Sequence, residues 1–249
     1  MKISIPCMEC SLSQATQTGA TANIPLYEMD VQEDGLYRLT CSNGHLSRVY
    51  LTSEKFELLF DIGLNAIVDG YYRDAVSSIT AALERFYEYF VKVYAASIGI
   101  DAEAYSSSWR EIKNQSERQL GAFIFSYLHW TRSKPVLLSN RFVEFRNAVI
   151  HKGKIPSKTE AIEYANVVLN LINPIVLKMK EELSETMRAI QHREFRDFTQ
   201  ALPASDARFA SMTMVGAISM ALAVSERHAM TIDERLRRIE LNRVVRRLG

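Results

Sequence analysis

The sequence predicts a mainly α-helical protein, with a helical bundle between a small β-rich module and a helical C-terminal extension. Apolar residues recur with helical spacing through most of residues 53–183. All 3 cysteines lie within residues 1–52, where short alternating segments are typical of strands. Residues 184–249 contain helix-capping signatures. We therefore expect three parts, bounded at these positions.

Composition narrows the class of protein. The chain has 249 residues, 47% of them hydrophobic, as in ordinary globular proteins, and its net charge is +1. Binding to nucleic acid would therefore depend on local patches. The first residues lack the apolar region of a signal peptide, and an odd number of cysteines argues against a disulfide framework, so we expect a cytoplasmic protein. The apolar stretch 210–224 is shorter than the roughly 20 residues that span a bilayer, so no membrane span is expected.

The N-terminal part has the signals of a β-hairpin. Residues 37–40 and 46–51 alternate between apolar and polar side chains, as strands do. Asn43 and Gly44 between them form a tight-turn signal.

Helical spacing begins after Thr52. Residues 56–67 carry apolar side chains at i, i+3 and i+4, and Gly70 interrupts this helix. A longer helix continues over residues 75–93, and Gly99 ends it. Further helices are expected over three ranges, 102–113, 116–131 and 140–151.

Capping residues predict the later helices. Ser157 with Glu160 forms a capping box that opens a long helix reaching about Glu182. After Pro203, Ser205 can cap a helix that continues through Val224, and Thr231 with Glu234 opens a last helix. That last helix is rich in arginine, which suits either a phosphate backbone or a solvated face: Arg235, Arg237, Arg238, Arg243, Arg246 and Arg247.

The cysteines have the spacing of a metal site. Cys7-x-x-Cys10 and Cys41-x-x-x-His45 are two short pairs, and each pair supplies one edge of the tetrahedron that zinc prefers. A redox CxxC would leave Cys41 and His45 unexplained, and reduced cysteines in a small β core are the other alternative. Four protein ligands leave no open position, so we expect structural Zn²⁺. The segment resembles a zinc ribbon, a module that often contacts nucleic acid or protein.

The segment Arg146-Asn147-Ala148-Val149-Ile150-His151 places a permanent cation, an amide and an imidazole at the end of a helix. Asn147 and His151 are four residues apart and share a face. An exposed basic helix end is the simpler interpretation of the same residues.

The layout of residues 54–183 resembles the HEPN domain. The resemblance is carried by the segment Ala81-Ala82-Leu83-Glu84-Arg85-Phe86 on an earlier helix, and by Arg146-Asn147-x-x-x-His151 followed by Lys-Gly and a Pro-Ser cap. In that family an Arg, a polar residue and a His at this spacing form a ribonuclease site. Glu84 matches a position that is often acidic in the family; a salt bridge on a solvated face is the alternative for it. Many HEPN toxins carry a modifiable tyrosine two residues after the His, where this chain has Gly153.

The resemblance implies a homodimer that brings two copies of the motif together. His151 would act as general base or acid on the ribose 2′-hydroxyl and the leaving oxygen. Arg146 would hold the phosphate, and Asn147 would orient His151 or the substrate. Cleavage would leave a 2′,3′-cyclic phosphate and a 5′-hydroxyl, without a metal in the chemistry.

These expectations describe a metal-independent endoribonuclease that binds RNA. By resemblance it would serve as a toxin or an effector of anti-phage defence, restrained by an antitoxin or a trigger partner. The alternative is a non-catalytic module that binds nucleic acid or protein and dimerises through its helical domain. A component of a larger complex is a third interpretation, which burial of Arg146 and His151 against the protein's own core would favour.

Overall fold

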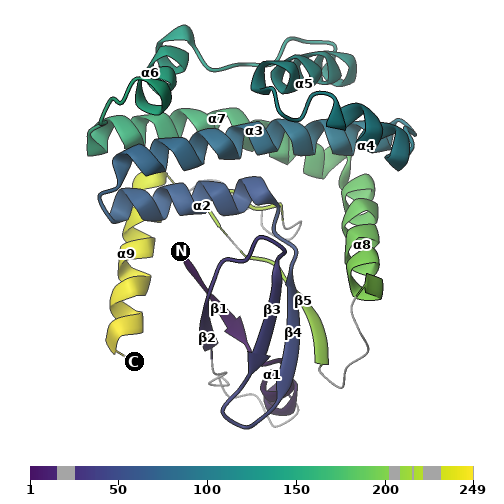
Figure 1. Cartoon of the computed structure of the whole chain (residues 1–249), viewed down its shortest axis with the longest axis vertical. Helices are drawn as coiled ribbons and strands as arrows, with labels where there is room; N and C mark the ends of the chain where they lie inside the picture. The colour runs from purple at the N-terminus through teal and green to yellow at the C-terminus, as the bar shows by residue number, and fades with distance from the viewer. Residues whose placement is uncertain (16–25, 202–207, 215, 221–230, 249) are drawn as a thin grey trace. The chain divides into compact units, whose positions relative to one another are not determined.

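The chain forms two compact units. The computed structural model describes residues 1–15, 26–201, 208–214, 216–220 and 231–248 (Figure 1). One unit comprises Met1–Ser53 and Gln191–Met214, and the other comprises Glu54–Ile190 and Val215–Gly249. The residues expected to form a separate C-terminal extension are thus divided between the two units.

The first unit contains two small sheets. Strands β1 (Lys2–Pro6) and β2 (Leu26–Asp30) pair antiparallel, and the short helix α1 (Met8–Ala15) follows β1. Strands β3 (Leu36–Thr40) and β4 (Leu46–Leu51) form the expected antiparallel hairpin. A strand from much later in the chain, β5 (Arg208–Met212), adds parallel to β4 (Figure 1).

The helix expected from Ser205 through Val224 is wrong across the described part of that range. Residues 208–212 form β5 in register with Ser47 to Leu51, and residues 213–214 and 216–220 are not helical. The rest of the range, 205–207, 215 and 221–224, lies outside the described residues. The Thr52 N–H extends the pairing by donating to the Met212 carbonyl at 2.8 Å. Unpaired backbone groups on the edge of β4 therefore decide the conformation of this segment, rather than its local spacing.

Helix α8 (Ser184–Ala201) lies within the stretch that the sequence predicts as helical, and aromatic packing holds its C-terminal half within the first unit. Phe198 stacks on Tyr50 of β4 with ring centroids 4.3 Å apart. Phe195 and Phe198 also contact Phe209 of β5. The three-stranded sheet thus gains a cover from the same C-terminal stretch that supplies its third strand.

The second unit is the helical bundle. The helices predicted over residues 56–182 are present: α2 (Lys55–Val68), α3 (Tyr72–Ser97), α4 (Ala102–Arg110), α5 (Ser116–Thr131), α6 (Asn140–His151) and α7 (Lys158–Glu182). Helix α3 is central, because it packs against α2, α5, α6 and α7. Figure 1 shows α2 on one side of α3, and α5 and α6 on the other. The predicted capping boxes at Ser157 and Thr231 are confirmed, the latter opening α9 (Ile232–Leu248).

Two carboxylates of α2, the buried Glu57 and the half-buried Asp61, bind the C-terminal stretch of this unit. Glu57 accepts from the Met220 N–H at 2.7 Å, and Asp61 accepts from the Ala217 N–H at 2.8 Å. Burial raises the pKa of Glu57 to about 8 and that of Asp61 to about 6, although these N–H donors act in the opposite direction. The carboxylates satisfy backbone donors that no helix or sheet satisfies.

Gly63 allows the close approach of α2 and α3, and replacing it by alanine should destabilise the bundle. A Cβ at this position would lie 2.5 Å from Cγ1 of Ile79 and 3.2 Å from the Ala75 carbonyl oxygen. Overpacking of this kind costs about 1–3 kcal/mol of the free energy of unfolding. Chemical denaturation measures the change.

Gly121→Ala is the matched control, because a Cβ at Gly121 of α5 would meet nothing within 4 Å. The control should instead stabilise the protein, by about 0.5–1 kcal/mol, through the lower backbone entropy of alanine. If both substitutions changed the free energy of unfolding in the same direction, the close approach of α2 and α3 at Gly63 would be contradicted.

Candidate functional site

All four predicted metal ligands lie together in the first unit. Cys7 precedes α1, Cys10 lies within α1, and the turn between β3 and β4 carries Cys41 and His45. Their four ligand atoms all lie within 4.8 Å of one another. The Cys10 Sγ is 3.4 Å from Nδ1 of His45 and 3.9 Å from Sγ of Cys41. Tetrahedral zinc, with bonds of roughly 2.0–2.3 Å, gives ligand separations of roughly 3.3–3.8 Å, so the arrangement can hold such an ion.

The hairpin turn shapes half of this cluster. Gly44 has a φ of +79°, a conformation that favours glycine, and its N–H donates to the Cys41 carbonyl at 2.9 Å. The Cys41 N–H donates to the His45 carbonyl at 3.1 Å. These bonds turn both ligand side chains toward α1. The tight turn predicted at residues 43–44 therefore also orients the ligands.

Polar neighbours surround the buried sulfurs. The Asn43 side-chain amide donates to Cys10 Sγ at 3.5 Å, and the Ser47 hydroxyl lies 3.8 Å from Cys7 Sγ. Burial raises the pKa of the Cys7 thiol, but hydrogen bonds from the Cys10 backbone, Ser47, Cys10 and His45 outweigh it and lower the pKa to about 6. Burial raises the pKa of Cys10. The hydrogen bonds at Cys7 therefore favour its thiolate, the form that binds a metal, whereas burial acts against the thiolate at Cys10.

The second candidate site is on α6, in the helical unit. Its apolar side packs on the bundle through buried Val149 and through Phe142 and Phe145, whose rings lie 6.4 and 5.7 Å from that of Tyr164 on α7. The buried Tyr164 hydroxyl hydrogen-bonds to the Thr80 hydroxyl of α3 at 2.9 Å. Helix α6 therefore has a defined rotation, which determines where Arg146 and its neighbours point.

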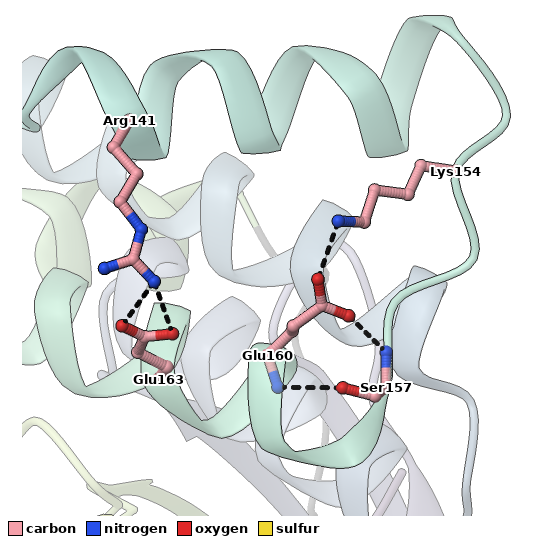
Figure 2. Close-up of polar contacts among 5 residues, drawn as sticks. All are labelled: Arg141, Lys154, Ser157, Glu160 and Glu163. Atoms are coloured by element: carbon pink, nitrogen blue, oxygen red, sulfur yellow. Dashed lines mark hydrogen bonds and ion pairs between the residues drawn. The ribbon is translucent and has the colours of Figure 1, made fainter.

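Polar contacts fix both ends of α6 on α7 (Figure 2). Arg141 donates to both carboxylate oxygens of Glu163, at 2.9 and 3.0 Å. After the helix ends, Lys154 pairs with Glu160 at 2.6 Å, and Glu160 also closes the capping box with Ser157. The segment that follows His151 is thus tied to the start of α7.

A hydrogen bond joins Arg146 to Asn147, while His151 makes no such contact with either of them in the part of the chain that the structure describes. The Arg146 Nε donates to Oδ1 of Asn147 at 3.1 Å, and both side chains are half-buried. His151 is exposed, and within the described residues no hydrogen bond or ion pair joins it to either of the other two. The corner that carries Arg146 and His151 is therefore not buried against the protein's own core.

Arg146 lines a pocket of about 210 Å³. Four of its lining residues share one face of α3, because they are spaced at i, i+3, i+4 and i+7: Thr80, Leu83, Glu84 and Tyr87. Ser116, Glu117 and Leu120 of α5, the loop residues Leu137 and Leu138, and Val143 of α6 complete the lining. Sequence reasoning named Arg146 and Glu84 but missed the others. The signal it overlooked is the mixed polar and apolar face of α3.

The charges of Glu84 and Arg146 both act on Tyr87, which lines this pocket, and on the buried Tyr164. Burial raises the pKa of Tyr164 to about 12 and raises that of Tyr87, while Arg146 lowers both and Glu84 raises both. No ion pair joins Glu84 to Arg146 in the part of the chain that the structure describes, although both line the same pocket. The pocket thus presents a carboxylate and a guanidinium that are not neutralised by each other.

The segment after His151 should loosen at low pH. The Lys154 ammonium and the Ser157 backbone hold the pKa of Glu160 down, at about 2 against an ordinary 4.5. A depressed pKa of this kind stabilises the fold above pH 4.5, and the contribution is lost as the pH falls toward 2. The protection factors for hydrogen exchange at residues 152–157, which compare each amide with its intrinsic rate at the same pH, should therefore fall across this range. In Glu160→Gln the protection should be low throughout, and unchanged protection factors at pH 2 would contradict the expectation.

Among the described residues, no helix combines the length and apolar character needed to cross a bilayer. Comparisons of the chain with protein-family models, with curated protein sequences and with solved structures found no match. The resemblance to the HEPN family therefore rests on the chain's own residues 54–183.

Proposed function

We propose that this protein is a metal-independent endoribonuclease whose site is formed by α6 residues of two copies of the chain. The observation that carries the proposal is the position of Arg146. It lines a pocket, is held by Asn147, and has no carboxylate partner in the described structure. A guanidinium in that state is suited to bind a phosphate.

Each of the three residues has a role in the proposed reaction. His151 removes the proton of a ribose 2′-hydroxyl, and the 2′-oxygen attacks the adjacent phosphorus. The bond to the 5′-oxygen breaks, and a protonated imidazole supplies its proton, which leaves a 2′,3′-cyclic phosphate and a 5′-hydroxyl. Arg146 stabilises the charge that develops on the phosphate. Asn147 orients the Arg146 guanidinium through its Nε hydrogen bond.

The proposed homodimer follows from the separation of His151 and Arg146. They are five residues apart, so they project about 140° apart around a helix with 3.6 residues per turn. The exposed His151 of one chain therefore suits the Arg146 pocket of a second copy better than its own. This supports a composite site of the kind implied by the HEPN resemblance.

The cysteine–histidine cluster has a separate role in this proposal. Four protein ligands fill a tetrahedral zinc ion and leave no position for substrate, so Zn²⁺ at Cys7, Cys10, Cys41 and His45 stabilises the first unit. By resemblance, we further propose a cytoplasmic toxin or anti-phage effector, restrained by an antitoxin or released by a trigger.

Cleavage of tRNA and mRNA in EDTA tests the proposal. The full-length protein should leave 2′,3′-cyclic phosphate ends, and His151→Ala should lower the rate by about 10²–10⁴-fold. His192→Ala is the matched control, because His192 is also an exposed helical histidine, and it should cleave like the unmodified protein. Metal content measured after the assay verifies that the cluster has kept its ion.

The second candidate is the non-catalytic binding module. The observation that favours it is that His151 does not line the pocket and forms no hydrogen bond or ion pair with Arg146 or Asn147 within the described residues, since a phosphate-binding pocket does not need that histidine. RNA binding that depends on Arg146, without cleavage and without an effect of His151→Ala, would select this candidate.

A further inference from the structure

The pocket beside Arg146 has charged groups that the proposed cleavage does not use. We propose that it receives a single nucleobase that carries an exocyclic amino group, with Glu84 accepting from that group while Arg146 binds the adjoining phosphate. This inference rests on the proposed function for the identity of the substrate as RNA. It assigns Glu84 a role in selecting the base at the cut site.

The size and walls of the pocket suit one base. Its volume of about 210 Å³ is below the roughly 300–1,000 Å³ of pockets for drug-sized ligands. Five aliphatic side chains contribute to the wall, and these can cover the flat faces of an aromatic ring: Leu83, Leu120, Leu137, Leu138 and Val143. A base removed from its stack would regain apolar contact there.

The polar groups of the pocket set the selectivity. Glu84 of α3 and Glu117 at the start of α5 present carboxylate oxygens, which only accept hydrogen bonds when ionised. Adenine, cytosine and guanine each carry an exocyclic amino group that can donate to a carboxylate, whereas the exocyclic groups of uracil are carbonyl oxygens and its one ring donor outside the sugar bond is N3–H. A carboxylate placed against the exocyclic position would therefore face an oxygen of uracil, and the site should bind uracil less tightly.

The separation of Glu84 from Arg146 supports a ligand between them. Both side chains are half-buried and line the same space, but they form no ion pair within the described residues. Charges that are partly removed from water are costly when they are left without partners. A nucleotide would give each charge a partner, with its amino group at Glu84 and its phosphate at Arg146. A nucleotide without an amino group would leave Glu84 without a partner and should bind less tightly.

Binding of the four nucleoside monophosphates to the full-length, metal-loaded protein tests this inference without requiring cleavage. By calorimetry, the nucleotide that binds best among AMP, CMP and GMP should bind at least about 10-fold more tightly than UMP. Glu84→Gln should bring UMP within about 3-fold of the preferred nucleotide, because the glutamine amide can donate to the uracil oxygen. Glu144→Gln, an exposed carboxylate on α6 that does not line the pocket, should retain the full preference.

The outcomes separate the two proposals. Equal affinity for UMP, or a preference that survives Glu84→Gln, would overturn the base assignment, whatever the cleavage assay shows. Selective binding that is lost in Glu84→Gln supports the pocket assignment even if His151→Ala reveals no cleavage. In that case only the proposed ribonuclease would fail.

Discussion

Replacing Cys41 by serine should abolish metal binding and unfold the first unit, while the helical unit remains folded. We expect close to one zinc ion per chain in the unmodified protein and almost none in the variant. A structural zinc site contributes about 10–16 kcal/mol to folding, as much as or more than the whole stability of an ordinary domain. Loss of one ligand from the cluster removes most of this contribution.

The reason for so large an effect is the small core of the first unit. Its two sheets are held by few buried apolar residues, chiefly Ile3, Ile5, Tyr37, Leu39, Val49 and Leu51. Small modules of this kind usually need a metal or a disulfide to remain folded, and the three cysteines are free. By contrast, the helical unit has an extended core of its own around α2, α3 and α7.

Elemental analysis measures the metal, and limited proteolysis shows which unit opens. Cleavage in Cys41→Ser should fall within residues 1–53 and 191–214, while residues 54–190 stay protected. Ser42→Ala is the control, since Ser42 lies in the same turn, is exposed and supplies no ligand. A folded, protease-resistant first unit in the metal-free variant would reject the structural role of the ion.

The helical part of the fold could be predicted because its signals are local. Apolar spacing, capping residues and interrupting glycines give the bounds of α6 as Asn140–His151 and open α7 after Ser157, as the structure has them. The Cys and His ligands could also be predicted from the sequence, because each pair lies within one turn and zinc needs few ligands. In both cases the determining residues are near one another in the sequence.

The failures of prediction lie where distant segments meet. Residues 208–212 read as part of an apolar helix, yet they form a strand because β4, about 160 positions earlier, offers an unpaired edge. Short apolar runs cannot be assigned to helix or strand by spacing alone. The pocket could not be predicted for the same reason. Its lining comes from α3, α5, α6 and the loop at Leu137 and Leu138, which meet only in the folded bundle.

Arg146→Ala should lower the rate of RNA cleavage by about 10²–10³-fold, the usual cost of losing one group that stabilises transition-state charge. Helix α6 keeps its aromatic contacts with Tyr164 and its ion pair with Glu163, so the fold and the melting temperature should change little. Arg146→Lys should restore only part of the rate. A lysine ammonium lacks the planar guanidinium that Asn147 holds through Nε, and it binds phosphate as a point charge.

Pairing two inactive variants tests whether Arg146 and His151 act from different copies of the chain. A heterodimer of Arg146→Ala with His151→Ala, isolated through two affinity tags, has one composite site with both residues intact and one with neither. If each site takes its arginine from one copy and its histidine from the other, this heterodimer should recover roughly half the activity of the unmodified dimer. If both residues act within one chain, neither site is complete and the mixture should stay as inactive as each parent. The exposure of His151, and the position of Arg146 about 140° away around α6, lead us to expect the recovery.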